Sequence, residues 1–222
     1  MSFPQKVKST LWAIVNSMTS SMDKFVKNPE KDFTRDRKLG FLQLVRFFLC
    51  MESGCISHEL LKYFYFLPDE VPTASAFIQQ RAKLRPDTFL HILRQLNLRF
   101  PTQKLWGKYS LIAADGCEFN IARNPQDPST FHPTSGRSKK GFNSIHTISL
   151  YDLLSKRYLD AIIQPGRRKN EFAALCQLID RYIYGGSPVF VADRGFASYN
   201  VFAHALEKGC FFAIRAKDVN IK

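Results

Sequence analysis

The chain has 222 residues, of which 45% are hydrophobic and 23% are charged. This composition is typical of a globular protein and excludes a disordered or collagen-like chain. Lys and Arg number 32 against 19 Asp and Glu, so the formal net charge is +13, which favours a polyanionic partner such as nucleic acid. The longest apolar run, residues 39–51, is interrupted by Arg46 and is shorter than the roughly 20 residues that a membrane span needs. We therefore expect no membrane partner and a cytoplasmic, nucleoid-associated protein.

The first part of the chain has helical periodicity. Residues 1–32 are treated as an N-terminal segment and residues 33–104 as a small helical, DNA-binding domain, because Pro101 and Gly107 break the periodicity near its end. Apolar spacings of three and four, capping residues and prolines predict four helices, over residues 33–51, 57–66, 73–84 and 86–98.

The third of these helices carries polar side chains after a short turn, as the recognition helix of a helix-turn-helix does. These side chains are Gln79, Gln80, Arg81 and Lys83. The alternative is a packing helix with a solvated face, and both interpretations stay open at this point.

Residues 105–222 have the pattern of an α/β (α+β) domain. Two short apolar runs, residues 111–114 and 189–192, are typical of strands that are buried on both faces. Between them the pattern predicts a hairpin of residues 144–151 and 157–164, then a helix capped by Asn170 and stopped by Gly185 and Gly186. A helix over 198–208 and a strand over 210–215 follow. This order predicts a ribonuclease-H-like mixed sheet with flanking helices.

The two apolar runs end in aspartates, Asp115 before Gly116 and Asp193 before Arg194 and Gly195. An ionised carboxylate at the end of a buried strand needs a partner, and a divalent metal ion would supply one. An Asp before Gly is also common in turns, so neither residue is informative alone. The pair in this strand order is the candidate catalytic and metal-binding site.

Basic residues gather near the same predicted elements and form the candidate DNA-binding set. They are Arg137, Lys139, Lys140, Arg167, Arg168, Lys169 and Arg194. Cations interleaved with Phe142 and Phe172 suit contact with the phosphate backbone, which supplies most sequence-independent affinity. The alternative interpretation is that these are solvated charged loops.

Several stretches together resemble a known family. Residues 111–116, 139–142 with His146, 164–166 with Asn170 and Glu171, and 191–196 are similar to the catalytic domain of bacterial insertion-sequence DDE transposases, in the insertion-sequence-4 branch. Residues 37–39, 75–77 and 80–84 resemble the N-terminal region of the same proteins. The resemblance extends over most of the chain.

The resemblance implies a chemistry for the two aspartates. Asp115 and Asp193 match the first two acids of the Asp-Asp-Glu triad, which binds two Mg²⁺ (or Mn²⁺) ions. One ion would activate a water or a 3′-hydroxyl, and the other would stabilise the leaving oxygen of an in-line displacement. The implied partners are double-stranded DNA, as transposon ends and target, and a second copy of the protein on that DNA.

The third acid of the triad has no counterpart in the expected pattern. Glu118, Glu171 and Glu207 are the glutamates of residues 105–222, and none lies in the Tyr-x-x-Arg-x-x-x-Glu-x-x-x-x-x-x-Lys pattern of the family. The sequence therefore predicts either a piece of a longer transposase or a truncated, inactive fragment that binds DNA as a decoy or repressor. A ribonuclease-H-like metal nuclease unrelated to transposition is the third alternative.

Overall fold

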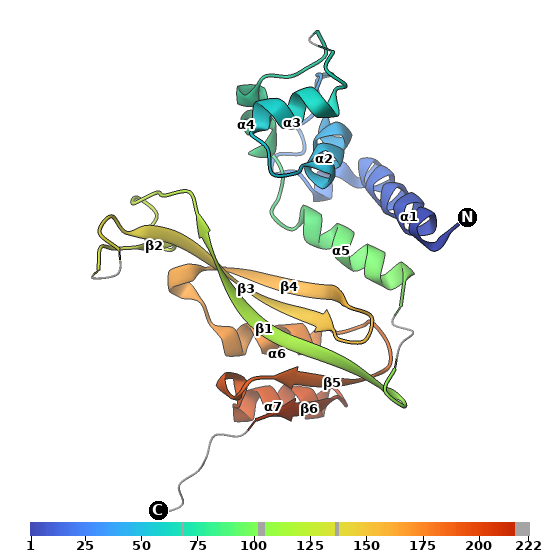
Figure 1. The fold of residues 1–222 in the computed structure, drawn as a ribbon, viewed down its shortest axis with the longest axis vertical. Coiled ribbons are helices and arrows are strands. Elements are labelled where there is room, and N and C mark those ends of the chain that lie inside the picture. Colours follow the sequence, from blue (N-terminus) through green and yellow to red (C-terminus); the bar gives the residue numbers. More distant parts are fainter. Residues whose placement is uncertain (68, 102–104, 136–137, 216–222) are drawn as a thin grey trace, which may run out of the picture. The chain divides into compact units, whose positions relative to one another are not determined.

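The computed structural model describes residues 1–67, 69–101, 105–135 and 138–215, and it divides into two compact units, Met1–Arg99 and Phe100–Lys222 (Figure 1). Each unit has a hydrophobic core of its own. In the described part of the chain no helix is both long and apolar enough to cross a membrane.

The first unit is helical. Its elements are α1 (Phe3–Ser17), the 3₁₀ helix η1 (Met18–Lys24), α2 (Phe41–Cys50), α3 (Ile56–Tyr63), α4 (Ala74–Arg81) and α5 (Thr88–Arg99). The four predicted helices are present, and α1 is an addition. Its start carries a capping box in which the backbone N–H of Ser2 donates to Gln5 Oε1 over 2.9 Å. Residues of α1, η1, α2 and α3 meet in one core that includes Val15, Met18, Leu44 and Leu60.

Two local expectations for this unit are wrong. The helix predicted from residue 33 begins at Phe41, because Phe33 has a left-handed φ of 61° and Gly40 is the extended N-cap. The second expectation is the short turn before α4 that a helix-turn-helix needs. The connection between α3 and α4 covers residues 64–73 and contains two further left-handed residues, Tyr65 and Phe66. It is longer than the three- to four-residue turn of a helix-turn-helix.

The second unit is a mixed sheet with helices. Its strands are β1 (Tyr109–Ile121), β2 (Phe131–His132), β3 (Phe142–Asp152), β4 (Arg157–Pro165), β5 (Ser187–Ala192) and β6 (Phe211–Ile214). The sheet has the order β2-β3-β1-β5-β6, and β4 also pairs with β3. The pairs β1–β3, β2–β3 and β3–β4 are antiparallel, whereas β1–β5 and β5–β6 are parallel. The predicted ribonuclease-H-like α/β fold is confirmed.

The predicted hairpin of β3 and β4 is also confirmed, and its turn has a clear local cause. Asp152 Oδ1 accepts the backbone N–H groups of Leu154 and Ser155 over 3.1 and 3.0 Å. Lys156 then adopts a left-handed φ of 54°, which returns the chain into β4.

One face of the sheet is covered by α6 (Glu171–Asp180) and α7 (Tyr199–Glu207), as Figure 1 shows. Alternate strand residues such as Ile112, Ile148 and Phe190 are fully buried against these helices. The residues between them point to the other face, which exposes apolar side chains. Phe119, Ile163 and Phe211 are 51%, 65% and 48% exposed there.

Candidate active site

Asp115 lies inside a strand and does not end one. β1 continues to Ile121, so the turn expected at Asp115 and Gly116 is absent. Gly116 has a packing role instead. A Cβ at this position would lie 2.9 Å from His146 Cε1 and Nε2 and 3.0 Å from Ile148 Cδ1, because both side chains project from β3 against β1. The glycine therefore leaves room for the His146 ring.

Asp193 directly follows β5, where the sequence predicts it. It is the N-cap of η3 (Arg194–Phe196), and its Oδ1 accepts the backbone N–H of Gly195 over 2.8 Å. Asp115 Oδ1 likewise accepts one backbone N–H, that of Gly116, over 2.8 Å. Both residues are exposed.

The parallel pairing of β1 with β5 relates the two aspartates. Its register aligns Ile112 with Phe190 and Ala113 with Val191, and each aspartate stands two residues further along its own chain. Because side chains alternate along extended backbone, both aspartates belong to the face opposite α6 and α7. Among the described residues, no group of three or more His, Cys, Asp or Glu side chains is arranged to hold a metal ion.

Two glutamates of this domain lie in a polar cluster on the helix-covered face. Ser144 donates to Glu118 Oε1 over 2.6 Å, and His132 Nε2 lies 2.8 Å from Ser144 Oγ. Since the one Ser144 hydroxyl hydrogen goes to Glu118, His132 donates to Ser144. His146 Nε2 lies 3.0 Å from Glu171 Oε1. We name this set the His–Glu cluster: Glu118, His132, Ser144, His146, Lys169 and Glu171.

The electrostatics of the cluster keep Glu118 ionised. The hydrogen bond from Ser144 lowers the pKa of Glu118, and Lys169, His132 and His146 act in the same direction, against the effect of burial. Lys169 Nζ lies 3.8 Å from Glu118 Oε2 and 3.5 Å from Glu171 Oε1. Both glutamates therefore already have cationic or hydrogen-bonding partners inside the domain.

In the sequence, Lys169 is a DNA-binding candidate and His146 and Glu171 belong to the family resemblance, but no common site is predicted for the six side chains. Part of the cluster could be found from strand periodicity, because residues two apart lie on the same side of a strand. Glu118 is therefore on the same side of β1 as Gly116, and Ser144 is on the same side of β3 as His146. Which strands are neighbours, however, depends on the fold.

The structure brings two of the predicted basic segments together. Lys139 and Lys140 precede β3, while Arg167 and Arg168 belong to η2 (Gly166–Arg168) after β4. Both segments are tied to β2, because Arg167 donates to the Phe131 carbonyl over 3.3 Å and Arg123, which stacks on the Phe131 ring, donates to the Lys140 carbonyl over 3.1 Å. Arg194 is the first residue of η3 and directly follows Asp193. Arg137 lies outside the described residues.

The segment that carries Arg167, Arg168 and Lys169 is held by hydrogen bonds and close packing at its two ends. Gln164 accepts the Asn170 backbone N–H over 2.9 Å and donates to the Asn170 carbonyl over 3.3 Å. The Asn170 side chain caps α6 by accepting the Ala173 N–H over 3.0 Å. Gly166 is buried, and a Cβ on it would lie 2.7 Å from the Ser144 carbonyl oxygen.

Replacing Gly166 by alanine is expected to destabilise the second unit by about 1–3 kcal/mol, the usual cost of overpacking. The added methyl group would meet both the hydroxyl and the carbonyl of Ser144. Urea unfolding of the full chain, followed by circular dichroism, measures the change. The double variant Gly166→Ala with Ser144→Ala should lose less free energy of unfolding than the sum of the two single variants. The reason is that the Ser144 hydroxyl, one of the two groups that the added methyl would meet, is absent. Unchanged stability of Gly166→Ala would contradict this packing account.

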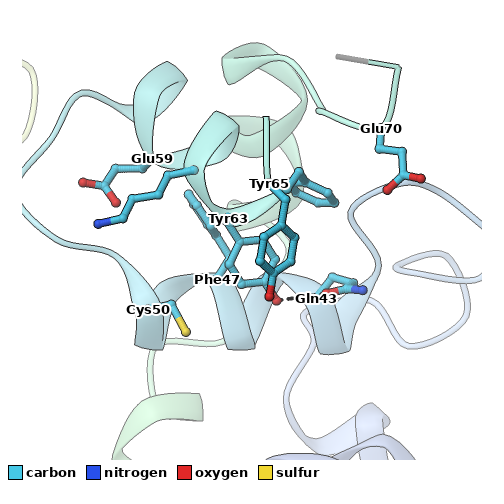
Figure 2. Close-up of a pocket in the computed structure, with 9 residues that line it drawn as sticks. Gln43, Phe47, Cys50, Glu59, Tyr63, Tyr65 and Glu70 are labelled. Carbon is cyan, nitrogen blue, oxygen red and sulfur yellow. Dashed lines mark hydrogen bonds between the residues drawn. The ribbon is translucent and has the colours of Figure 1, made fainter. Parts of the chain in front are cut away.

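The helical unit contains a pocket between α2 and α3, drawn in Figure 2, with a volume of about 460 Å³. The Tyr63 hydroxyl donates to Gln43 Oε1 over 2.9 Å, the dashed line in the figure, and burial raises the pKa of Tyr63. Glu59 accepts the N–H groups of Glu52 and Gly54, and Lys62 pairs with Glu52. In the described part of the chain, the charged groups near this pocket thus have partners within the protein, apart from Glu70 at its edge.

The strand order, the parallel β1–β5 pair and the helices on one face define a protein of the ribonuclease-H-like class. Residues 106–221 match the family model described as transposase DDE domain, and the chain belongs to this family. A comparison with curated proteins gave no match. The match agrees with the DDE transposase resemblance of the sequence and assigns the protein a role in transposition.

Proposed function

We propose that Asp115 and Asp193 are the first two acids of a DDE site, and that the protein is a bacterial transposase of the insertion-sequence-4 branch acting on transposon ends. The observation that carries this proposal is the register of β1 and β5, in which Ala113 pairs with Val191. Asp115 and Asp193 are exposed, and each follows the aligned pair Ala113 and Val191 by two residues, on the same face of the sheet. Two carboxylates placed in this way suit a shared ligand. The ligand class is a divalent cation, since carboxylate oxygens are hard donors.

The chemistry of these two side chains fits Mg²⁺ or Mn²⁺. Each aspartate uses Oδ1 to accept one backbone N–H, and Oδ2 has no hydrogen bond or ion pair in the described part of the chain. Ions bound there would supply Lewis acidity for phosphodiester cleavage and strand transfer. Asp115 and Asp193 would hold the ions, while the basic residues beside β2 and Arg194 hold the DNA backbone.

DNA binding by the basic segments should depend steeply on salt, because each phosphate contact releases counterions. Replacing Arg167, Arg168 and Lys169 together by glutamine is expected to reduce the slope of log K against log salt by about 1–2, at roughly 0.9 per contact, because Lys169 already pairs with Glu118 and Glu171. Fluorescence anisotropy with a labelled duplex, measured from low to moderate NaCl, gives the slope.

The matched control removes three cations of the same unit away from these segments, Lys108, Lys156 and Lys208, which are exposed. Their replacement by glutamine should change the slope much less. Affinity that is insensitive to salt, or equal slopes for the two triple variants, would refute backbone binding by these segments.

A second candidate function is DNA binding without cleavage, as a decoy or repressor. It is favoured by the positions of the domain's glutamates. Glu118 and Glu171 belong to the His–Glu cluster on the helix-covered face, and Glu207 is the last residue of α7. None of these three extends the pair of aspartates to a triad.

A further inference from the structure

A second pocket of the helical unit has an unusual set of lining charges. It has a volume of about 480 Å³ and lies between the 30–39 loop and the end of α4. We call it the basic pocket, and its lining residues are Glu30, Lys31, Phe33, Thr34, Arg35, Arg37, Leu39, Gln80 and Lys83. Four cations and one carboxylate give it a local charge of +3 (four minus one).

The four cations, Lys31, Arg35, Arg37 and Lys83, have no carboxylate partner within 4.0 Å in the described part of the chain. The Lys83 ammonium lies 5.3 Å from the centre of the Phe33 ring, which holds it without neutralising it. Like charges gathered around one cavity repel each other, and a bound anion would remove that cost.

The walls of the basic pocket are fixed by the backbone. The buried Asp32 carboxylate accepts the Asn28 N–H over 2.9 Å, and the Asp32 N–H donates to the Asn28 carbonyl over 2.8 Å. The left-handed Phe33 follows. On the other side, the Lys27 N–H donates to the Lys83 carbonyl over 2.9 Å. The cations therefore project from a closed loop that is tied to the end of α4.

Gln80 is an independent observation that points to a ligand. Its side chain is buried, with the residue 8% exposed, and its Oε1 has no hydrogen-bond partner among the residues that the structure describes. A buried acceptor without a donor is costly. An arginine drawn inward by an anion has five N–H donors, enough to bind the anion and the Gln80 oxygen together.

We propose that the basic pocket is an oxyanion site that takes a phosphate of the DNA backbone, bound by Arg35, Arg37, Lys31 and Lys83. A single arginine guanidinium can bind a phosphate with two parallel hydrogen bonds, and the net charge of the whole chain is +13. This proposal rests on the proposed function in one respect only, that the phosphate comes from DNA. It gives the helical unit a DNA contact of its own, through a pocket instead of the short turn of a helix-turn-helix.

The first test compares two double variants of the full chain in duplex binding. Arg35→Gln with Arg37→Gln removes two cations of the pocket, and Lys6→Gln with Lys8→Gln removes two exposed cations of α1 in the same unit. The pocket variant is expected to reduce the salt slope by about 1–2, at roughly 0.9 per lost phosphate contact, and the α1 variant much less. Equal slopes for the two variants would overturn the assignment to DNA phosphate.

The second test uses inorganic phosphate as the probe and thermal unfolding as the readout. Phosphate should raise the Tm of the wild-type chain above that in NaCl of equal ionic strength, and the rise should be lost in the arginine double variant. Gln80→Leu should raise the Tm without phosphate and reduce the phosphate-dependent shift, which a purely structural Gln80 would not do. Absence of any phosphate shift in the wild-type chain would overturn the oxyanion site.

The two measurements separate the possible failures. A phosphate shift with an unchanged DNA slope would mean that the pocket binds a free phosphate and not the DNA backbone, which refutes the proposal as stated. Failure of the wild-type chain to bind duplex DNA would refute the proposed function, while the phosphate shift would still report on the pocket.

Discussion

The 222-residue chain is expected to retard duplex DNA in a gel and to release little or no cleaved strand in Mg²⁺. Two ions about 3.5–4 Å apart need several anionic ligands, and the described part of the chain brings no third acidic, His or Cys side chain into a metal-holding group with Asp115 and Asp193. Metal affinity should therefore be weak. Gel electrophoresis of an end-labelled duplex, with Mg²⁺ or Mn²⁺, measures binding and cleavage in one experiment.

Extending the chain by a helix that carries the family's glutamate pattern should produce cleavage, and Asp193→Asn should abolish that cleavage without reducing DNA retardation. Robust cleavage by the 222-residue chain that is lost in Asp193→Ala would mean that a third ligand exists. Glu118→Gln and Glu171→Gln would then be the first variants to examine. From their places in the His–Glu cluster we expect both to leave cleavage by the extended chain largely unchanged.

Replacing Arg181 by methionine is expected to cost about 1–3 kcal/mol of stability, because Asp160 is buried but the Arg181 side chain is one-third exposed. Arg181 Nε donates to Asp160 Oδ2 over 2.7 Å, and another guanidinium N–H donates to the Ala161 carbonyl over 2.8 Å. Asp160 is 1% exposed, and its Oδ1 also accepts the Ala161 N–H over 2.8 Å, so the variant loses the charge-assisted bond but not every donor. Urea unfolding of the full chain gives the change.

Arg168→Met is the control, because Arg168 is exposed and should change stability by no more than about 0.5 kcal/mol. Adding Asp160→Asn to Arg181→Met should recover part of the loss, since the negative charge that faced the guanidinium is removed. A loss below about 1 kcal/mol for Arg181→Met would show that water or another group solvates Asp160.

The elements that sequence reasoning located well are those with local causes. The β3–β4 hairpin follows from Asp152 and Lys156 at its turn, and α6 follows from its Asn170 cap. The start of α1 also has local signals, Ser2 and Gln5. The apolar residues Val7, Leu11, Ile14 and Val15 that follow have helical spacing, so this helix too has a local cause.

The details that sequence reasoning missed depend on contacts between distant residues. Asp115 and Gly116 have the composition of a turn, yet β1 continues because it stays paired with β3 as far as Ile121. The helix-turn-helix interpretation of Gln80 failed for a similar reason, since this residue is buried in the helical unit. Periodicity in one segment cannot reveal which side chain from elsewhere packs against it.

The parallel pairing of β1 with β5 also couples ligand binding to folding. Ala113 and Val191 are far apart in sequence, and closing the chain between them costs conformational entropy that only the complete sheet recovers. An unfolded chain therefore has no defined spacing between Asp115 and Asp193. Any cation that bridges the two aspartates binds the native state alone, and at a hundred times its Kd it adds about 2.7 kcal/mol to the free energy of unfolding. The central strands of the sheet would thus gain stability from the same ion that the two carboxylates hold.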